Sequence, residues 1–160
     1  MTLSELRERA IAPALAMLPA RMNSVAAEVQ MLAIGLQESR FEHRKQIGGP
    51  AKGFWQFEQG GGVRGVLRHS ASREHALAVC RVRNVIATEG AVYAALEHDD
   101  VLAAAFARLL LWTDPKALPA LGDEQGAWDL YLRVWRPGKP HRRTWDALYE
   151  QAMEEVTCSA

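Results

Sequence analysis

The stretch VQMLAIGL, residues 29–36, is apolar at every position except Gln30. A helix that is apolar on all sides belongs in the interior of a protein rather than on its surface. Asn23 or Ser24 has a side chain suited to cap the start of such a helix, and we expect the helix to end at about Ser39. The rest of the chain should therefore pack around this segment.

Helical periodicity also dominates the segments on either side of residues 29–36. Thr2 and Glu5 have the spacing of a capping box, and Pro13 is expected to kink the helix that they open. Further helices are predicted over Ser72 to about Thr88, over a short Ala-rich stretch after Gly90, over Val101–Trp112 with Asp99 or Asp100 as its cap, over Trp128–Trp135 and over Trp145–Val156. No alternating strand pattern of useful length is present, so the sequence predicts a mainly α fold.

Only the segment from about Phe41 to Leu67 resists a helical interpretation. It contains seven of the twelve glycines and has room for short extended pieces around Phe54–Phe57. Long irregular segments inside a helical domain are more often functional or mobile than idle. Since the chain shows no repeat and no linker, we expect one domain over residues 1–160 with a functional loop at 41–67.

Composition excludes several classes of protein. The 160 residues include 19 Lys plus Arg and 19 Asp plus Glu, so net charge does not hold this chain on nucleic acid. A hydrophobic share of 49% excludes global disorder. The two cysteines, Cys80 and Cys158, could form one bridge, but free thiols are favoured. No zinc spacing is present, so neither a metal nor another cofactor is expected.

Glu38 lies at the end of the predicted buried helix, on the same face as the apolar side chains of Ala27, Met31 and Ile34. A carboxyl group held against apolar side chains is costly to ionise, and the C-terminal end of a helix dipole opposes its ionisation as well. A glutamate that is protonated near neutral pH can act as a general acid. Alternatively, Glu38 reaches solvent and pairs with Arg40 or Arg44.

Two segments resemble a known family of glycan-cleaving enzymes. The first is Ile34–Phe41 (IGLQESRF), and the second is Gly49–Gln56 (GPAKGFWQ). Their order and spacing resemble the Glu-Ser and Gly-Ala-x-Gly-Leu-Met-Gln segments of lytic transglycosylases in the lysozyme-like superfamily, to which goose-type lysozymes also belong. The resemblance implies a lysozyme-like helical domain with its cleft between the Glu38 helix and the loop at 41–67.

The resemblance also implies roles for single residues. Glu38 matches the catalytic acid/base, Ser39 the neighbour that lies along the glycan, and Gln56 the glutamine that contacts the sugar beside the scissile bond. Phe54 and Trp55 stand where the family has Leu and Met. They would make the cleft wall more aromatic, which suits the apolar faces of sugar rings.

The family's later Ala-Tyr-Asn-Ala-Gly segment has no full counterpart. The nearest place is Ala104–Arg108, which has Phe106 and lacks both the Tyr hydroxyl and the Asn. Either another tyrosine, Tyr93 or Tyr131, orients Glu38, or the activity is altered or lost.

A second carboxylate would decide the chemistry of cleavage. Glu58 follows the Gln56 segment and is the best candidate. If Glu58 faces Glu38 across a cleft, it can hold a water molecule as a base, and the enzyme is a hydrolase. If Glu58 is a solvated loop charge, Glu38 works alone, as it does in a lytic transglycosylase.

Two surface features have alternative interpretations. The stripe Trp128, Tyr131 and Trp135 has core spacing but could line a sugar subsite. A basic cluster around a predicted turn could attract anionic cell-wall polymers or nucleic acid, or be an ordinary solvated loop; it consists of Arg136, Lys139, His141, Arg142 and Arg143.

The expected function is cleavage of the peptidoglycan glycan strand between N-acetylmuramic acid and N-acetylglucosamine, with peptidoglycan as the partner and neither nucleic acid nor membrane involved. Glu5 and Glu8 cancel the charge of Arg7 and Arg9, so a folded helix is expected at the N-terminus instead of a signal peptide. This fits a phage or prophage protein that is cytoplasmic until it reaches the wall, or that is carried by the virion. The rival is a non-catalytic lysozyme-like module that binds glycan or builds the virion. The oligomeric state is left open.

Overall fold

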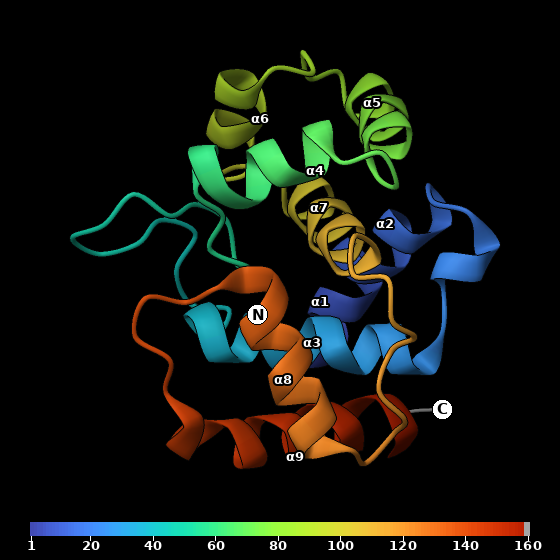
Figure 1. Ribbon diagram of the computed structural model, residues 1–160, viewed down its shortest axis with the longest axis vertical. Helices are drawn as coiled ribbons and strands as arrows, with labels where there is room; N and C mark the ends of the chain where they lie inside the picture. Colours follow the sequence, from blue (N-terminus) through green and yellow to red (C-terminus); the bar gives the residue numbers. More distant parts are fainter. Residues whose placement is uncertain (159–160) are drawn as a thin grey trace.

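Helix α3, Val25–Ser39, is the segment around which the other helices pack. The Ser24 hydroxyl caps it by accepting a hydrogen bond from the amide of Ala27 at 3.0 Å. Helix α9 packs against it from one side and α7 from another, as Figure 1 shows. The apolar residues of 29–36 are all buried, so the expectation drawn from that stretch is confirmed.

The computed structural model describes residues 1–158, and these residues are mainly helical without a β-strand among them. The remaining α-helices are α1 Leu3–Leu6, α2 Ala12–Ala16, α4 Arg64–Arg68, α5 Arg73–Val82, α6 Glu89–Ala95, α7 Asp100–Trp112, α8 Glu124–Trp135 and α9 Arg142–Cys158. Their buried side chains join into a continuous core. Within the described chain, no helix is both long and apolar enough to cross a membrane. Cys80 is buried, Cys158 is exposed, and both are free thiols.

The N-terminal helix opens with the predicted capping box between Thr2 and Glu5. A π-helical turn, Arg7–Ile11, separates α1 from α2, and Pro13 lies in the first turn of α2. Proline has no amide hydrogen and its ring collides with the carbonyl four residues earlier, so the helix widens just before it. The expected kink thus takes the form of a wider turn in a continuing helix.

Two predicted boundaries are wrong. Helix α5 ends at Val82 instead of continuing to about Thr88, because Asn84 takes a left-handed conformation with φ of 56°. In the Gly-rich segment, residues 59–68 are helical apart from a kink at Gly61: a π-helical turn, Gln59–Val63, leads into α4. The glycines of this part disfavour a helix, but burial of Val63 and Val66 in the core outweighs the low helix propensity of glycine.

Residues 42–57 remain irregular, and the part that precedes the buried Phe54 projects from the body, on the left of Figure 1. Isolated bridges join Lys45 to Lys52 and Lys52 to Phe57. Arg44 holds the segment to α7 through two hydrogen bonds to the Asp100 carboxylate, at 2.8 and 2.9 Å. The segment is therefore anchored at its base, whereas Ile47 is 82% exposed.

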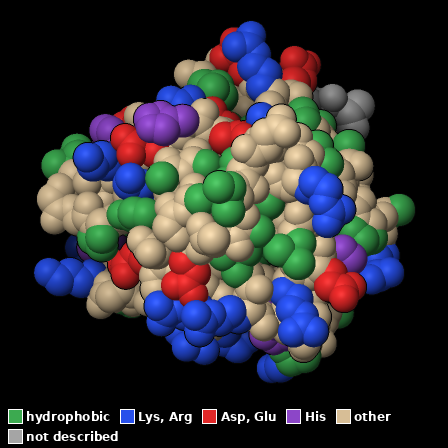
Figure 2. All heavy atoms as spheres, turned by 90° about the horizontal axis from the view of Figure 1, so that it is seen from above, with side chains coloured by type: hydrophobic (Ala, Val, Ile, Leu, Met, Phe, Trp, Pro, Cys, Tyr) green, Lys and Arg blue, Asp and Glu red, His purple; other side chains and the backbone are tan. Residues whose placement is uncertain are grey.

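The face formed by α4, α5 and α6 carries basic, acidic and hydrophobic side chains interspersed with one another (Figure 2). The exposed large apolar side chains on this part of the chain are Leu77, Val82 and Ile86. Such a mixture is typical of a solvated surface.

Near the end of α3, the aromatic ring of Phe41 packs directly against Gly35. A methyl group at Gly35 would overlap the ring of Phe41. We expect Gly35→Ala to lower the free energy of unfolding by about 1–3 kcal/mol, because the ring must leave its place in the core. Urea unfolding followed by circular dichroism measures this change.

Gly65→Ala is the matched control, because the nearest atom to a methyl group there is 3.9 Å away. An alanine in this helix should be neutral or stabilising by up to about 1 kcal/mol. Equal effects of the two substitutions would contradict the packing described here.

Candidate active site

Glu38 lies in the last turn of α3 and is half-buried. The hydroxyl of Tyr131, on α8, donates a hydrogen bond to Glu38 Oε1 at 2.6 Å. Burial raises the pKa of Glu38 to about 7, and the bond from Tyr131 acts in the opposite direction. At neutral pH a large share of the molecules therefore carries a proton on this carboxyl group, as a general acid requires.

Tyr131 is fixed by aromatic side chains on both sides. It is 3% exposed, and its ring stacks on Trp145 with a centroid distance of 5.4 Å and an interplanar angle of 8°. Trp128 packs against it with a centroid distance of 5.3 Å. Burial and the neighbouring Glu38 raise the pKa of Tyr131, so the hydroxyl stays protonated and remains a donor.

The predicted stripe Trp128, Tyr131 and Trp135 thus belongs mainly to the core. Trp128 and Tyr131 are buried, and Trp135 is half-buried. The indole of Trp135 donates a hydrogen bond to the carbonyl of Trp55 at 2.9 Å. Because this bond joins α8 to the Gly-rich segment, the stripe holds the site together instead of presenting an aromatic surface to a ligand.

Of the two tyrosines considered as the orienting group, Tyr131 makes the contact. Tyr93 donates its hydroxyl to the carbonyl of Pro50 instead. Phe106, in the stretch nearest to the family's tyrosine segment, packs against Phe57 with a centroid distance of 6.5 Å. The hydroxyl that reaches Glu38 therefore comes from a different helix than the resemblance indicates.

Neither arginine considered as a partner of Glu38 pairs with it. Arg44 pairs with Asp100, and Arg40 donates to the carbonyl of Leu36. The positive φ of 55° at Arg40 and at Phe41 turns the chain away at the end of the helix. Glu38 thus keeps a neutral partner, which leaves its raised pKa uncompensated by a cation.

Ser39 does not lie where a glycan could touch it. It is 6% exposed, and its hydroxyl donates to the carbonyl of Phe54 at 2.6 Å while accepting from the amide of Phe41 at 3.1 Å. The expectation of a substrate contact is corrected here: Ser39 joins the end of α3 to the Gly-rich segment.

The prediction that Phe54 and Trp55 form the wall of a cleft is also wrong, because both are core residues. They are 1% and 0% exposed, and the Trp55 indole donates to the carbonyl of Met31 at 2.8 Å. The ring of Phe41 meets both edge-on, with centroid distances of 5.5 Å. Burying an aromatic side chain contributes about 2–3 kcal/mol, which favours the interior over an exposed position.

Gln56 and Glu58 are accessible. Gln56 is half-buried with φ of 53°, and its side-chain amide donates to the carbonyl of Gly53 at 2.8 Å, so its amide oxygen can still accept. Glu58 is exposed, and within residues 1–158 its side chain makes no hydrogen bond or ion pair. Burial and Tyr131 account for the pKa of Glu38 without a contribution from Glu58.

A pocket with a volume of about 510 Å³ lies between the end of α3 and the start of α9. Its lining residues are Gln37, Arg40, Pro140, His141, Arg142, Arg143 and Thr144. Glu38 does not line this pocket, although Gln37, the residue before it in the chain, does. In the described part of the chain, no group of three or more His, Cys, Asp or Glu side chains could hold a metal ion.

Comparison with known proteins adds no family: no family model, no curated protein and no solved structure matches this chain. The site is therefore interpreted from its own geometry. The contact that sequence reasoning left open is the one between Glu38 and Tyr131. Its only signal in the sequence is a hydroxyl within an aromatic stripe that otherwise has core spacing.

We expect Tyr131→Phe to raise the pKa of Glu38 above about 7. The tyrosine bond favours the ionised carboxylate, so its loss leaves burial unopposed. Carbon-13 NMR titration of the Glu38 carboxyl measures the shift. Tyr149→Phe is the control, since Tyr149 is equally buried but bonds the amide of Gly122. A downward shift in Tyr131→Phe would contradict the contact.

Stability should depend on the ionisation of Glu38. Its pKa is about 7 in the folded protein against 4.5 for an unperturbed group, so the folded state binds the extra proton between these values. Folding stability from this group is therefore present at low pH and lost as the pH rises toward 7. Glu38→Gln should remove that loss.

Urea unfolding of both proteins at pH 4.5 and pH 8 tests this linkage. We expect Glu38→Gln to gain stability relative to wild type between the two pH values, on the order of 2 kcal/mol. An unchanged difference between wild type and variant would show that the Glu38 carboxyl is not withdrawn from water.

Proposed function

We propose that this protein cleaves the glycan strand of peptidoglycan between N-acetylmuramic acid and N-acetylglucosamine, with Glu38 as the acid/base. The observation that carries the proposal is a half-buried carboxyl group, with a pKa of about 7, at the end of a core helix and held by a buried tyrosine. The resemblance of residues 34–41 and 49–56 to lytic transglycosylases supports the choice of substrate.

The geometry at Glu38 suits proton donation. Tyr131 occupies Oε1, which leaves Oε2 to carry the proton. In the first step Oε2 gives this proton to the glycosidic oxygen, and the bond between that oxygen and C1 of the muramic acid breaks. The carboxylate that forms is stabilised by the Tyr131 hydrogen bond, which is stronger to a charged acceptor than to a neutral one.

The second step returns the proton. As the 6-hydroxyl oxygen of the same sugar attacks C1, the Glu38 carboxylate takes the hydroxyl proton. A 1,6-anhydro ring closes, and Glu38 is ready for the next bond. One group therefore serves as acid and then as base, which is the requirement of lytic transglycosylation.

Transglycosylation is favoured over hydrolysis by the state of Glu58. A hydrolase of this kind needs a second carboxylate to activate water. Glu58 is exposed, and it does not contribute to the pKa of Glu38. Glu38 acting alone therefore fits the observations better than a pair of carboxylates.

The test is clearing of purified cell walls, followed by turbidity, with wild type and Glu38→Gln. We expect the variant to lose about a hundredfold to ten-thousandfold in rate, because an amide replaces the proton donor. Circular dichroism checks the fold, and Glu74→Gln, an exposed residue of α5, is the matched control. Mass spectrometry of the products should find ends that lack one water.

Two outcomes would redirect the interpretation. Products with the full mass of hydrolysis would assign a hydrolase, and Glu58→Gln would then be expected to abolish clearing. If folded wild type fails to clear walls of any type tested, the rival assignment leads: a non-catalytic module that binds glycan or builds a virion. Burial of Ser39, Phe54 and Trp55, which leaves fewer groups to grip a sugar, favours that rival.

A further inference from the structure

The pocket between the end of α3 and the start of α9 has an unusual charge. Of its seven lining residues, Arg40, Arg142 and Arg143 are cationic, whereas none is acidic. Three of the five residues in the basic cluster noted in the sequence line this pocket: His141, Arg142 and Arg143. A concave site lined by guanidinium groups without lining acids fits an anionic ligand.

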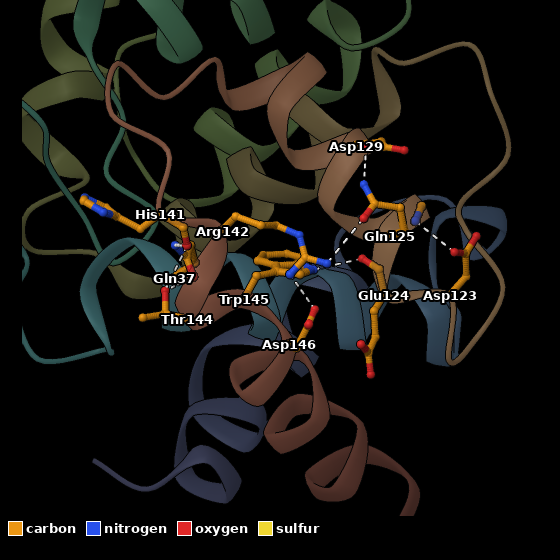
Figure 3. Close-up of polar contacts among 11 residues, drawn as sticks. Gln37, Asp123, Glu124, Gln125, Asp129, His141, Arg142, Thr144, Trp145 and Asp146 are labelled. Carbon is orange, nitrogen blue, oxygen red and sulfur yellow. Dashed lines mark hydrogen bonds and ion pairs between the residues drawn. The ribbon is translucent and has the colours of Figure 1, made fainter.

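The polar floor of this pocket is held in place by hydrogen bonds within the protein. The Gln37 side-chain amide donates to the carbonyl of His141 at 3.0 Å, and the Thr144 hydroxyl donates to Gln37 Oε1 at 3.0 Å, as Figure 3 shows. Because Gln37 belongs to α3 and Thr144 to α9, these bonds fix the two walls relative to each other. The pocket is thus formed before a ligand arrives.

The three arginines differ in how many of their hydrogen-bond donors, and how much of their charge, are left for a ligand. Arg142 donates to Asp146 at 2.6 Å and to Gln125 at 3.3 Å, so its charge is largely used (Figure 3). Arg40 donates one of its amino groups to the carbonyl of Leu36 and keeps its other donors. Arg143 is exposed and makes no ion pair within residues 1–158. Arg40 and Arg143 are therefore the cations that can receive a ligand.

Arg142 and Arg143 lie at the positive end of a helix dipole, where Asp146 offsets the charge of Arg142 but no ion pair within residues 1–158 offsets that of Arg143. They begin the 17-residue helix α9, whose first turn has no acidic residue. A cation at the positive end of a helix dipole costs about 0.3–1 kcal/mol. A bound anion would offset this electrostatic cost, and it would also accept hydrogen bonds from the guanidinium groups that have donors left.

The pocket is also close to Glu38. Gln37 and Arg40 come from the same turn of α3 as Glu38 but lie on another side of the helix. Gln37, which lines the pocket, directly precedes Glu38 in the chain, so the pocket and the Glu38 carboxyl belong to the same end of α3.

We propose that this pocket binds a carboxylate of the peptide stems attached to the glycan, with Arg40 and Arg143 as the main contacts. The proposal rests on the proposed function, since the stem is carried by the muramic acid next to the scissile bond. The planar fork of a guanidinium group matches a carboxylate through two parallel hydrogen bonds. The enzyme would then select glycan that still bears its stems.

The test uses a synthetic stem tetrapeptide with free carboxylates, and the same peptide with its carboxylates amidated. Calorimetric titration of wild type at low salt should give binding at least about tenfold tighter for the charged peptide. Arg40→Gln combined with Arg143→Gln should abolish this preference. Arg73→Gln combined with Arg81→Gln, two exposed residues of α5, makes the same change of charge elsewhere and should preserve it.

Equal binding of the two peptides, or binding of neither, would overturn the proposal. Inorganic phosphate is the third probe. If phosphate binds through Arg40 and Arg143 while the peptide does not, the proposal is also overturned, because the pocket then serves the phosphates of another wall polymer.

Wall clearing by the same preparations separates this proposal from the proposed function. If the wild-type protein clears walls but does not bind the charged peptide, the proposal of a stem-binding pocket is overturned and the proposal of glycan cleavage is supported. A wild type that binds the charged peptide through the two arginines but does not clear walls supports the pocket and removes cleavage.

Discussion

The hydrogen bond between Tyr131 and Glu38 is the interaction on which the site depends. Burial of α3 withdraws the Glu38 carboxyl from water, and withdrawal alone would make the ionised form costly. A cation in contact would return the pKa toward its ordinary range and remove the acid. A neutral hydroxyl instead orients the carboxyl group while leaving its pKa near 7.

The position of that hydroxyl is decided by aromatic packing. Tyr131 is stacked on Trp145 of α9 and lies one turn before Trp135, whose indole is bonded to the backbone at Trp55. Three segments that are distant in the sequence therefore meet at this point: the end of α3, the Gly-rich segment and the pair α8 and α9. A change in any of these contacts is transmitted to the carboxyl, because a packed interior has little free space to absorb it.

The Gly-rich segment has a different relation to the site than its motif indicates. Phe54 and Trp55 are interior side chains, and Ser39 bonds the backbone between them and the helix. These residues shape the site from beneath by fixing the end of α3. Of the residues that the resemblance assigns to the site, Glu38 and Gln56 are half-buried and Glu58 is exposed.

The sequence by itself determined the helical class, the buried helix with a cap at Asn23 or Ser24, the capping box at Thr2, and Glu38 as a carboxyl at the end of the buried helix. These features follow from local chemistry: the period of apolar residues, and side chains that bond their own backbone. The sequence alone predicted an irregular conformation for residues 59–68, which are largely helical. Glycine propensity is a local property that the sequence shows, whereas burial of Val63 and Val66 depends on the tertiary structure. Only the tertiary structure decided that Tyr131 rather than Tyr93 meets Glu38, that Phe54 and Trp55 point inward, and that Arg40 and Arg143 share a pocket. Each of these depends on which helix faces which across the core, and periodicity along one helix contains no information about its neighbour.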